Sequence, residues 1–175
     1  LGAKVTVTSA QSAVEPSDAW LGRIVDAMGN PIDGKGPLMR GGIPYLLKAN
    51  PLAPSQRARV HGKMDMGIRA INTFLTTCRG QRLGIFAGSG VGKSILMSML
   101  ARYSQADVNV IGLVGERGRE VQEFIEDDLG EEGLKRSILV VATSSDSALM
   151  RRQAAYTTMA IAEYFRDQKK DVLCL

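Results

Sequence analysis

A short glycine-rich segment has the residue types and spacing of a phosphate-binding loop. Residues 87–94 read Ala-Gly-Ser-Gly-Val-Gly-Lys-Ser, which matches the pattern G-x-x-x-x-G-K-[ST] except for Ala87 in the position of the first glycine. Glycines let successive backbone N–H groups turn toward an anion, a lysine adds positive charge, and a serine hydroxyl can ligate Mg²⁺. The pattern predicts that a phosphate group contacts Gly88, Ser89, Gly90, Val91, Gly92, Lys93 and Ser94.

The neighbouring residues predict the elements that must position this loop. Residues 83–86 are mostly apolar and precede it, and residues 95–102 favour a helix and follow it. A strand, a loop and a helix in this order are the setting that the motif requires, with the positive end of the helix dipole at the phosphates. This context favours a phosphate site over the alternative, a glycine-rich connector that binds nothing.

A second group of charged residues follows another apolar run. Glu116 and Arg117 come directly after residues 108–114 and a glycine. Because the carboxyl ends of parallel strands meet at one edge of a sheet, we expect Glu116 near the phosphate loop, where it could activate a water molecule. Arg117 could hold this carboxylate or face a γ-phosphate. The alternative is a structural ion pair between Glu116 and Arg117 at the start of a helix.

The hydrophobic pattern predicts an α/β fold with a parallel sheet and flanking helices. Four runs are apolar at successive positions, as expected for strands that are covered on both faces, namely residues 83–87, 108–114, 138–142 and 172–175. An amphipathic helix is predicted near residues 118–129 and should end at Gly130. A longer helix is predicted over residues 147–166. In such a sheet, ligands bind beyond the carboxyl ends of the strands.

Composition restricts the class of protein further. The chain has 175 residues, 45% apolar and 23% charged, which fits one globular domain and excludes disordered and disulfide-scaffold proteins. No apolar run reaches the ~20 residues that cross a bilayer, so we expect a cytoplasmic protein. Cys78 and Cys174 are predicted to be reduced core thiols. The net charge of +4 is too small to indicate nucleic-acid binding.

Several segments together resemble the rotary F1-type ATPase superfamily, namely residues 79–86, 115–120, 22–26 and 29–36. Within it, the loop and two further segments most resemble the type III export ATPases of the flagellar branch, namely residues 121–125 and 150–156. The resemblance covers residues 20–175. It implies a P-loop NTPase fold of the RecA/F1-like kind.

The resemblance also assigns roles to single residues. It implies that residues 88–94 bind the phosphates of ATP, that Lys93 neutralises them and that Ser94 ligates Mg²⁺. Glu116 would be the catalytic carboxylate, and Arg117 its neighbour facing the γ-phosphate. Non-catalytic rotary-ATPase subunits carry Gln in place of this Glu, so the resemblance implies a catalytic subunit.

By the same resemblance, the intact protein forms a homo-hexameric ring, and its ATP hydrolysis energises type III protein export for flagellum assembly. The partners implied are export-apparatus proteins, exported flagellar subunits and an inner-membrane export gate reached peripherally from the cytoplasm, with no nucleic acid. Alternatives are a catalytic subunit of a rotary ATP synthase, an RNA-translocating hexameric ATPase, or a nucleotide-binding module without turnover. The 9 aromatic residues do not cluster with Lys and Arg as RNA-stacking surfaces do.

We expect the chain to be a fragment. Residues 1–19 would be a remnant of, or a linker from, an N-terminal β-barrel, and residues 20–175 the N-terminal part of the ATPase domain. Residues 171–175 resemble the strand that leads to the metal-binding Walker B Asp. Without that Asp and a neighbour's arginine finger we expect an inactive fragment. Two positions depart from the family's usual Thr and Asp, and we assign them no role: Met66 and Asn72.

Overall fold

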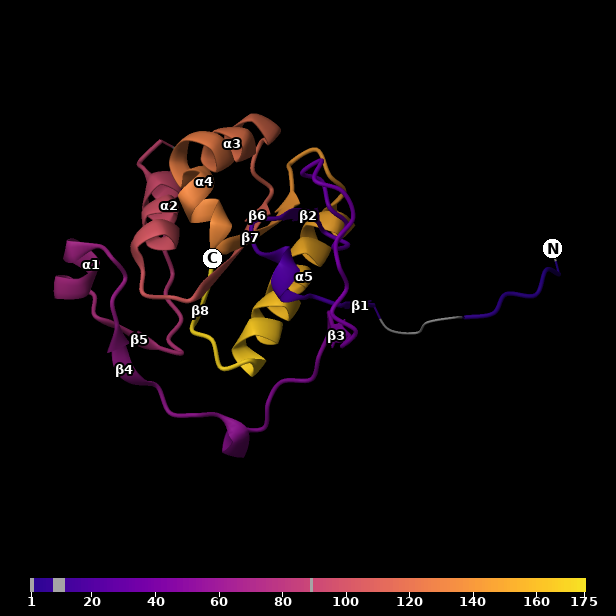
Figure 1. The fold of residues 1–175 in the computed structure, drawn as a ribbon, viewed down its shortest axis with the longest axis horizontal. Helices are drawn as coiled ribbons and strands as arrows, with labels where there is room; N and C mark the ends of the chain where they lie inside the picture. The colour runs from indigo at the N-terminus through magenta and orange to yellow at the C-terminus, as the bar shows by residue number, and fades with distance from the viewer. Residues whose placement is uncertain (1, 8–11, 89) are drawn as a thin grey trace.

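A parallel sheet of four strands forms the centre of the computed structural model, which describes residues 2–7, 12–88 and 90–175. The strand order is β2–β7–β6–β8, and every neighbouring pair is parallel (Figure 1). The strands are β2 (Ile24–Asp26), β6 (Val108–Val114), β7 (Ser137–Ala142) and β8 (Val172–Cys174). The predicted α/β class is therefore confirmed, and three of the four predicted strands form.

One long helix, α5 (Ala148–Asp167), covers one face of the sheet. Its Ile161 and Phe165 are fully buried against Val110 of β6 and Val140 of β7. This contact explains the apolar character of the segment, because alternate strand residues must face it. The helix predicted over residues 147–166 is thus confirmed, with a shift of one residue at each end.

Shorter helices cover the other face of the sheet (Figure 1). Ile111 and Leu139 point to this side and pack with Phe124 and Leu129. The helices are α2 (Lys93–Tyr103), α3 (Gly118–Glu123), the π-helix η3 (Phe124–Leu129) and α4 (Gly130–Lys135). Together α3 and η3 span the predicted helix, and η3 ends at Leu129 with Gly130 as its C-cap, as expected. The sequence did not predict that α4 begins at Gly130.

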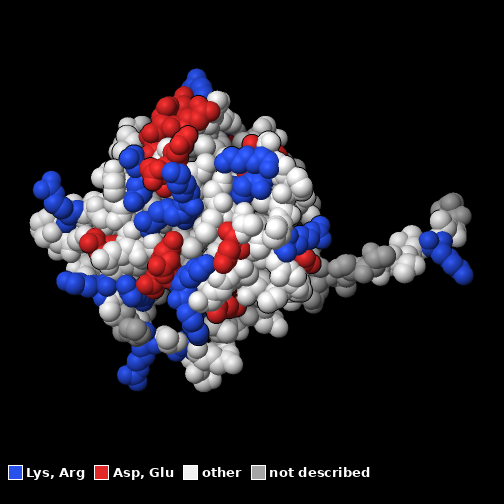
Figure 2. Space-filling view, viewed as in Figure 1, with Lys and Arg blue, Asp and Glu red and all other residues white. Residues whose placement is uncertain are grey.

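Acidic side chains gather on the outer face of these helices. Figure 2 shows them as a patch over α3 and α4, and the chain places seven carboxylates there: Glu120, Glu123, Glu126, Asp127, Asp128, Glu131 and Glu132. The apolar residues of the same segment are buried or partly buried. The predicted amphipathic pattern therefore separates a solvated acidic face from the core.

The remaining elements are short and lie mostly in the first 80 residues, as the frequent Gly and Pro residues favour. Two antiparallel pairs form, β1 (Ala13–Val14) with β3 (Tyr45–Leu46) and β4 (His61–Met64) with β5 (Thr77–Arg79). The helical turns are η1 (Asp18–Trp20), η2 (Pro54–Gln56) and α1 (Arg69–Phe74). None of the described helices is long and apolar enough to cross a membrane.

The strand predicted over residues 83–87 is not formed. Residues 81–88 are all described and contain no strand, and the exposed fraction is 51% for Leu83 and 97% for Phe86. The run is apolar, but neither edge strand of the central sheet pairs with it. Because a strand requires a neighbour for its hydrogen bonds, apolar character alone did not determine this segment.

The expectation of two core thiols is also wrong. Both cysteines are free, but Cys78 is half-buried and Cys174 is exposed. Cys174 lies on β8, an edge strand of the sheet. A cysteine at a sheet edge lacks the neighbouring strand that would cover it.

Candidate phosphate-binding site

The glycine-rich loop leads directly into helix α2. Lys93 is the first residue of this helix, and Gly92 before it has φ +93, while Gly90 has φ +76. Both values lie in the left-handed region, which glycine adopts without the steric cost that a Cβ atom brings. Among described residues other than glycine, only Lys169 has a positive φ, so Ala87 keeps a negative one. Ser89 lies outside the described residues.

Lys93 makes a direct contact with Glu116. The Nζ atom of Lys93 donates a hydrogen bond to Oε1 of Glu116 at 2.8 Å, and both side chains are partly exposed. This hydrogen bond is the largest cause that lowers the pKa of Glu116 below its ordinary value, while burial acts in the opposite direction. Glu116 is therefore an ionised carboxylate at neutral pH, beside the cation of the loop.

The backbone explains how two residues 23 positions apart come together. Strand β6 ends at Val114, and Gly115 turns the chain with φ +82. The N–H of Gly115 donates to the carbonyl of Ala142 at the end of β7, at 2.7 Å. Glu116 thus stands at the carboxyl edge of two parallel strands, as the sequence predicts, and α2 places Lys93 at the same edge.

The ion pair between Glu116 and Arg117, which the sequence left open as an alternative, is not formed. Arg117 precedes the first residue of α3 and lies 3.5 Å from Glu120, with 76% of its side chain exposed. Its partner is therefore one helical turn along α3, while Glu116 turns to Lys93. Sequence adjacency was misleading here, because consecutive residues at a helix start point in different directions.

Ser94 is exposed, and its hydroxyl makes no hydrogen bond with a described residue. No group of three or more His, Cys, Asp or Glu side chains in the described ranges could hold a metal ion by itself. Mg²⁺ commonly keeps several water molecules and is bound through phosphate oxygens and few protein ligands. One free hydroxyl beside a phosphate loop fits that mode of binding.

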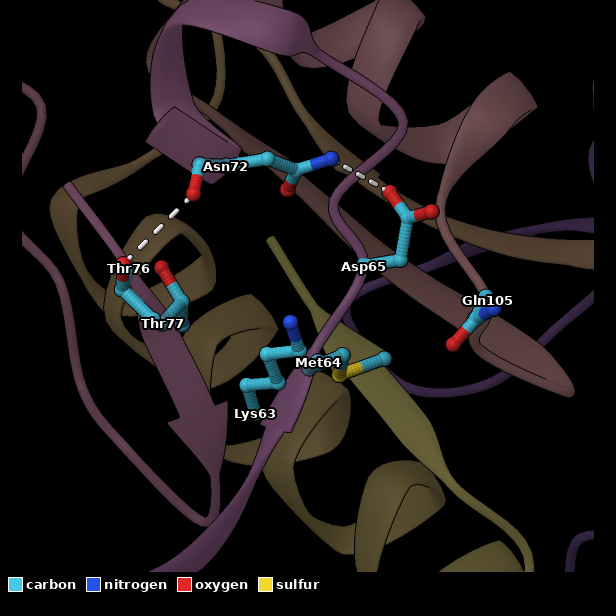
Figure 3. A pocket seen from close by; sticks show the side chains of 7 residues that line it. All are labelled: Lys63, Met64, Asp65, Asn72, Thr76, Thr77 and Gln105. Carbon is cyan, nitrogen blue, oxygen red and sulfur yellow. Dashed lines mark hydrogen bonds between the residues drawn. The ribbon is translucent and has the colours of Figure 1, made fainter. Parts of the chain in front are cut away.

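A pocket of about 250 Å³ lies elsewhere, between β4, α1, β5 and the segment that follows α2. Figure 3 shows Asn72 pointing toward Asp65 across it. The side-chain amide of Asn72 donates to Asp65 at 2.6 Å, and its oxygen accepts from the N–H of Met66 at 2.9 Å. Asn72 thus fixes the turn around Met66. None of the predicted phosphate-site residues lines this pocket.

Sequence reasoning missed one contact of the site. The N–H of Ser144, in the loop after β7, donates to the carbonyl of Glu116 at 2.9 Å. The available signal was the run Thr-Ser-Ser-Asp-Ser at residues 143–147, which follows a predicted strand and is rich in residues that bond to nearby backbone.

The fold and the site define the class of this domain. P-loop α/β nucleotide-binding domains combine a parallel sheet, a glycine loop at the start of a helix and a carboxylate just beyond the end of a strand, as residues 88–94 and Glu116 do here. Comparison with known families agrees. The model for the ATP synthase alpha/beta family, nucleotide-binding domain, matches residues 67–175. The chain belongs to this family.

Two curated proteins that are similar to this chain carry the name flagellum-specific ATP synthase. That of Caulobacter vibrioides is 59% identical over 174 residues, which are 99% of this chain and 39% of the relative. That of Bacillus subtilis is 54% identical over 172 residues, which are 98% of this chain and 39% of the relative. The chain therefore spans about two fifths of the length of these relatives.

Two solved structures are also similar. One is described as a prototypical ATPase from the type III secretion system of pathogenic bacteria, with TM-score 0.87 and 44% identity over 93% of this chain and 47% of that one. The other is the assembled ATPase EscN with its central stalk EscO from enteropathogenic E. coli, with TM-score 0.86 and 44% identity over 93% of this chain and 40% of that one.

Gly92→Ala tests the left-handed turn of the loop. We expect it to lower the free energy of unfolding by about 1 kcal/mol, because alanine is strained at φ +93. Gly88→Ala is the matched control: a Cβ atom meets nothing within 4 Å at either position, but Gly88 has no left-handed φ. The control should be neutral or slightly stabilising. Equal denaturant midpoints for the two variants would contradict the loop geometry.

Proposed function

We propose that the intact protein is a Mg-dependent ATPase that forms a homo-hexameric ring and energises type III protein export for flagellum assembly. The observation that supports it best is the 2.8 Å contact of Lys93 with Glu116, at the carboxyl edge of a parallel sheet. The similarity to flagellum-specific ATP synthases and to a type III secretion ATPase points to the same activity.

The mechanism begins with an exchange of partners at Lys93. The phosphates of ATP enter the loop of residues 88–94 and take over the ammonium group of Lys93. Glu116 is thereby released from its ion pair, and its carboxylate can orient a water molecule and accept its proton. Arg117 has 76% of its side chain exposed, so its guanidinium group is accessible to the γ-phosphate. The Ser94 hydroxyl would hold Mg²⁺, which when bound would neutralise developing negative charge.

The proposed partners follow from the relatives. We infer that the protein works in the cytoplasm, contacts export-apparatus proteins and exported flagellar subunits, and associates peripherally with an inner-membrane export gate. The described assembly of EscN with its stalk EscO supports a ring with bound partners.

We also propose residues 20–175 as part of one ATPase domain, since β2 pairs with β7, and residues 1–19 as a linker or remnant of another.

We further propose that residues 1–175 alone hydrolyse ATP poorly. The segment that leads into the phosphate loop is exposed and unpaired, with Phe86 97% exposed. A loop that lacks a braced strand before it is not preorganised for phosphate, and preorganisation supplies much of the rate in phosphoryl transfer.

Lys93→Ala in the full-length protein should abolish tight ATP binding and turnover, since the charge that stabilises the phosphates is removed. Calorimetric titration with ATP and a phosphate-release assay measure the two effects. Lys135→Ala is the control, because Lys135 is an exposed lysine paired with Glu132 on α4. Wild-type affinity and rate in Lys93→Ala would remove the phosphate-loop assignment.

Glu116→Gln should separate binding from chemistry. The amide keeps the shape of the side chain but not its basicity, so ATP should still bind while turnover falls by ~10²–10⁴. Glu123→Gln is the control, because Glu123 is an exposed carboxylate paired with Arg119. Turnover of Glu116→Gln within about a factor of three of wild type would argue that Glu116 has only a structural role.

A further inference from the structure

A hydrogen-bonded loop beside Glu116 has no role in the mechanism above. It comprises residues 143–146, which lie in the connection between β7 and α5. We propose that Asp146 is a positioning residue for Glu116: its carboxylate fixes this loop, and the loop in turn holds the backbone of Glu116. The inference rests on the proposed ATPase function and concerns the same site.

Asp146 closes the loop on itself through one oxygen. Its Oδ2 atom accepts a hydrogen bond from the N–H of Thr143 at 2.7 Å and another from the Thr143 hydroxyl at 2.9 Å. The N–H of Asp146 donates back to the carbonyl of Thr143 at 3.1 Å. A single oxygen of Asp146 accepts both hydrogen bonds from Thr143. The loop therefore requires a hydrogen-bond acceptor at position 146, and not a negative charge.

The closed loop presents the N–H of Ser144 to Glu116. This group donates to the Glu116 carbonyl at 2.9 Å, while the N–H of Gly115 donates to Ala142 at 2.7 Å. The two bonds bracket the peptide between Gly115 and Glu116. They fix the point from which the Glu116 side chain reaches Lys93.

Core packing does not explain these contacts. Ser144, Ser145 and Asp146 are all exposed, and Asp146 has no ion pair with a described residue. The hydrogen bonds of the loop therefore serve its shape. The shape of the loop fixes the position of the Glu116 carboxylate. To act as a base, this carboxylate must lie within hydrogen-bond reach of a water molecule.

Loosening the loop should affect the chemical step more than binding. Lys93 begins α2 and residues 88–92 lead into it, whereas Asp146 bonds to Thr143 in the loop that holds the backbone of Glu116. A displacement of about 1 Å of a catalytic group can cost as much as 10²-fold in rate. We therefore expect Asp146→Ala to lower kcat about 10-fold or more, with the Kd for ADP within about twofold of wild type.

Rescue by the conservative variant tests the positioning role. Asp146→Asn keeps an oxygen that can accept both bonds from Thr143, so its kcat should stay within about threefold of wild type. A residue that acted by its charge would lose function in both variants. Asp127→Ala is the matched control, since it makes the same truncation at an exposed aspartate of η3.

The experiment measures kcat by phosphate release and Kd by calorimetry with ADP in the full-length protein, with thermal unfolding as the check on folding. If Asp146→Ala proves unstable, Ser144→Pro provides the decisive variant, because proline removes the N–H that holds Glu116. Unchanged kcat in Ser144→Pro, or in a folded Asp146→Ala, overturns the proposal. Loss of kcat in Asp146→Asn overturns it as well. Absence of ATP turnover in the wild type would instead overturn the proposed function.

Discussion

The ion pair between Lys93 and Glu116 is the interaction on which the site depends. Its two members come from separate elements, α2 and the end of β6, and they meet at 2.8 Å only because both elements reach the carboxyl edge of the sheet. An ion pair that is partly exposed contributes little to folding. In the proposed mechanism, this weakness lets phosphate displace the carboxylate from the lysine at small cost in free energy, and the displaced carboxylate then acts as a base.

The rest of the fold supports this arrangement. Helix α5 buries one face of the sheet, and the helices from α2 to α4 bury the other, so the strands that end at the site are fixed from both sides. Asn109 of β6 adds a polar tie, because its buried amide donates to the carbonyl of Ala101 on α2 at 2.8 Å. The helix that carries Lys93 and the strand that precedes Glu116 are thereby held together.

Much of this could be predicted from sequence, because local signals determined it. The glycine loop, the α5 helix and the buried strands β6 and β7 follow from residue types and periodicity, and the order of strands and helices placed Glu116 at the sheet edge. Prediction from sequence was less successful where the structure of a segment depends on contacts with residues distant in the chain. Residues 83–87 have the composition of a strand but no neighbouring strand with which to pair. Glu116 contacts a lysine 23 positions away and not the adjacent Arg117. The bond from Ser144 to Glu116 is likewise a long-range contact: the polar run at residues 143–147 indicates a hydrogen-bonded loop but does not identify Glu116 as its partner.

The affinity of ADP for Glu116→Gln, compared with wild type by calorimetry without hydrolysis, tests the central claim most directly. If Glu116 and the phosphates compete for Lys93, the variant should bind ADP about two- to fivefold more tightly, as expected from the small energy of an exposed ion pair. Glu123→Gln removes one negative charge from an exposed carboxylate that is paired with Arg119 and not with Lys93, and it should change the affinity less. Equal or weaker binding of ADP to Glu116→Gln would contradict the account.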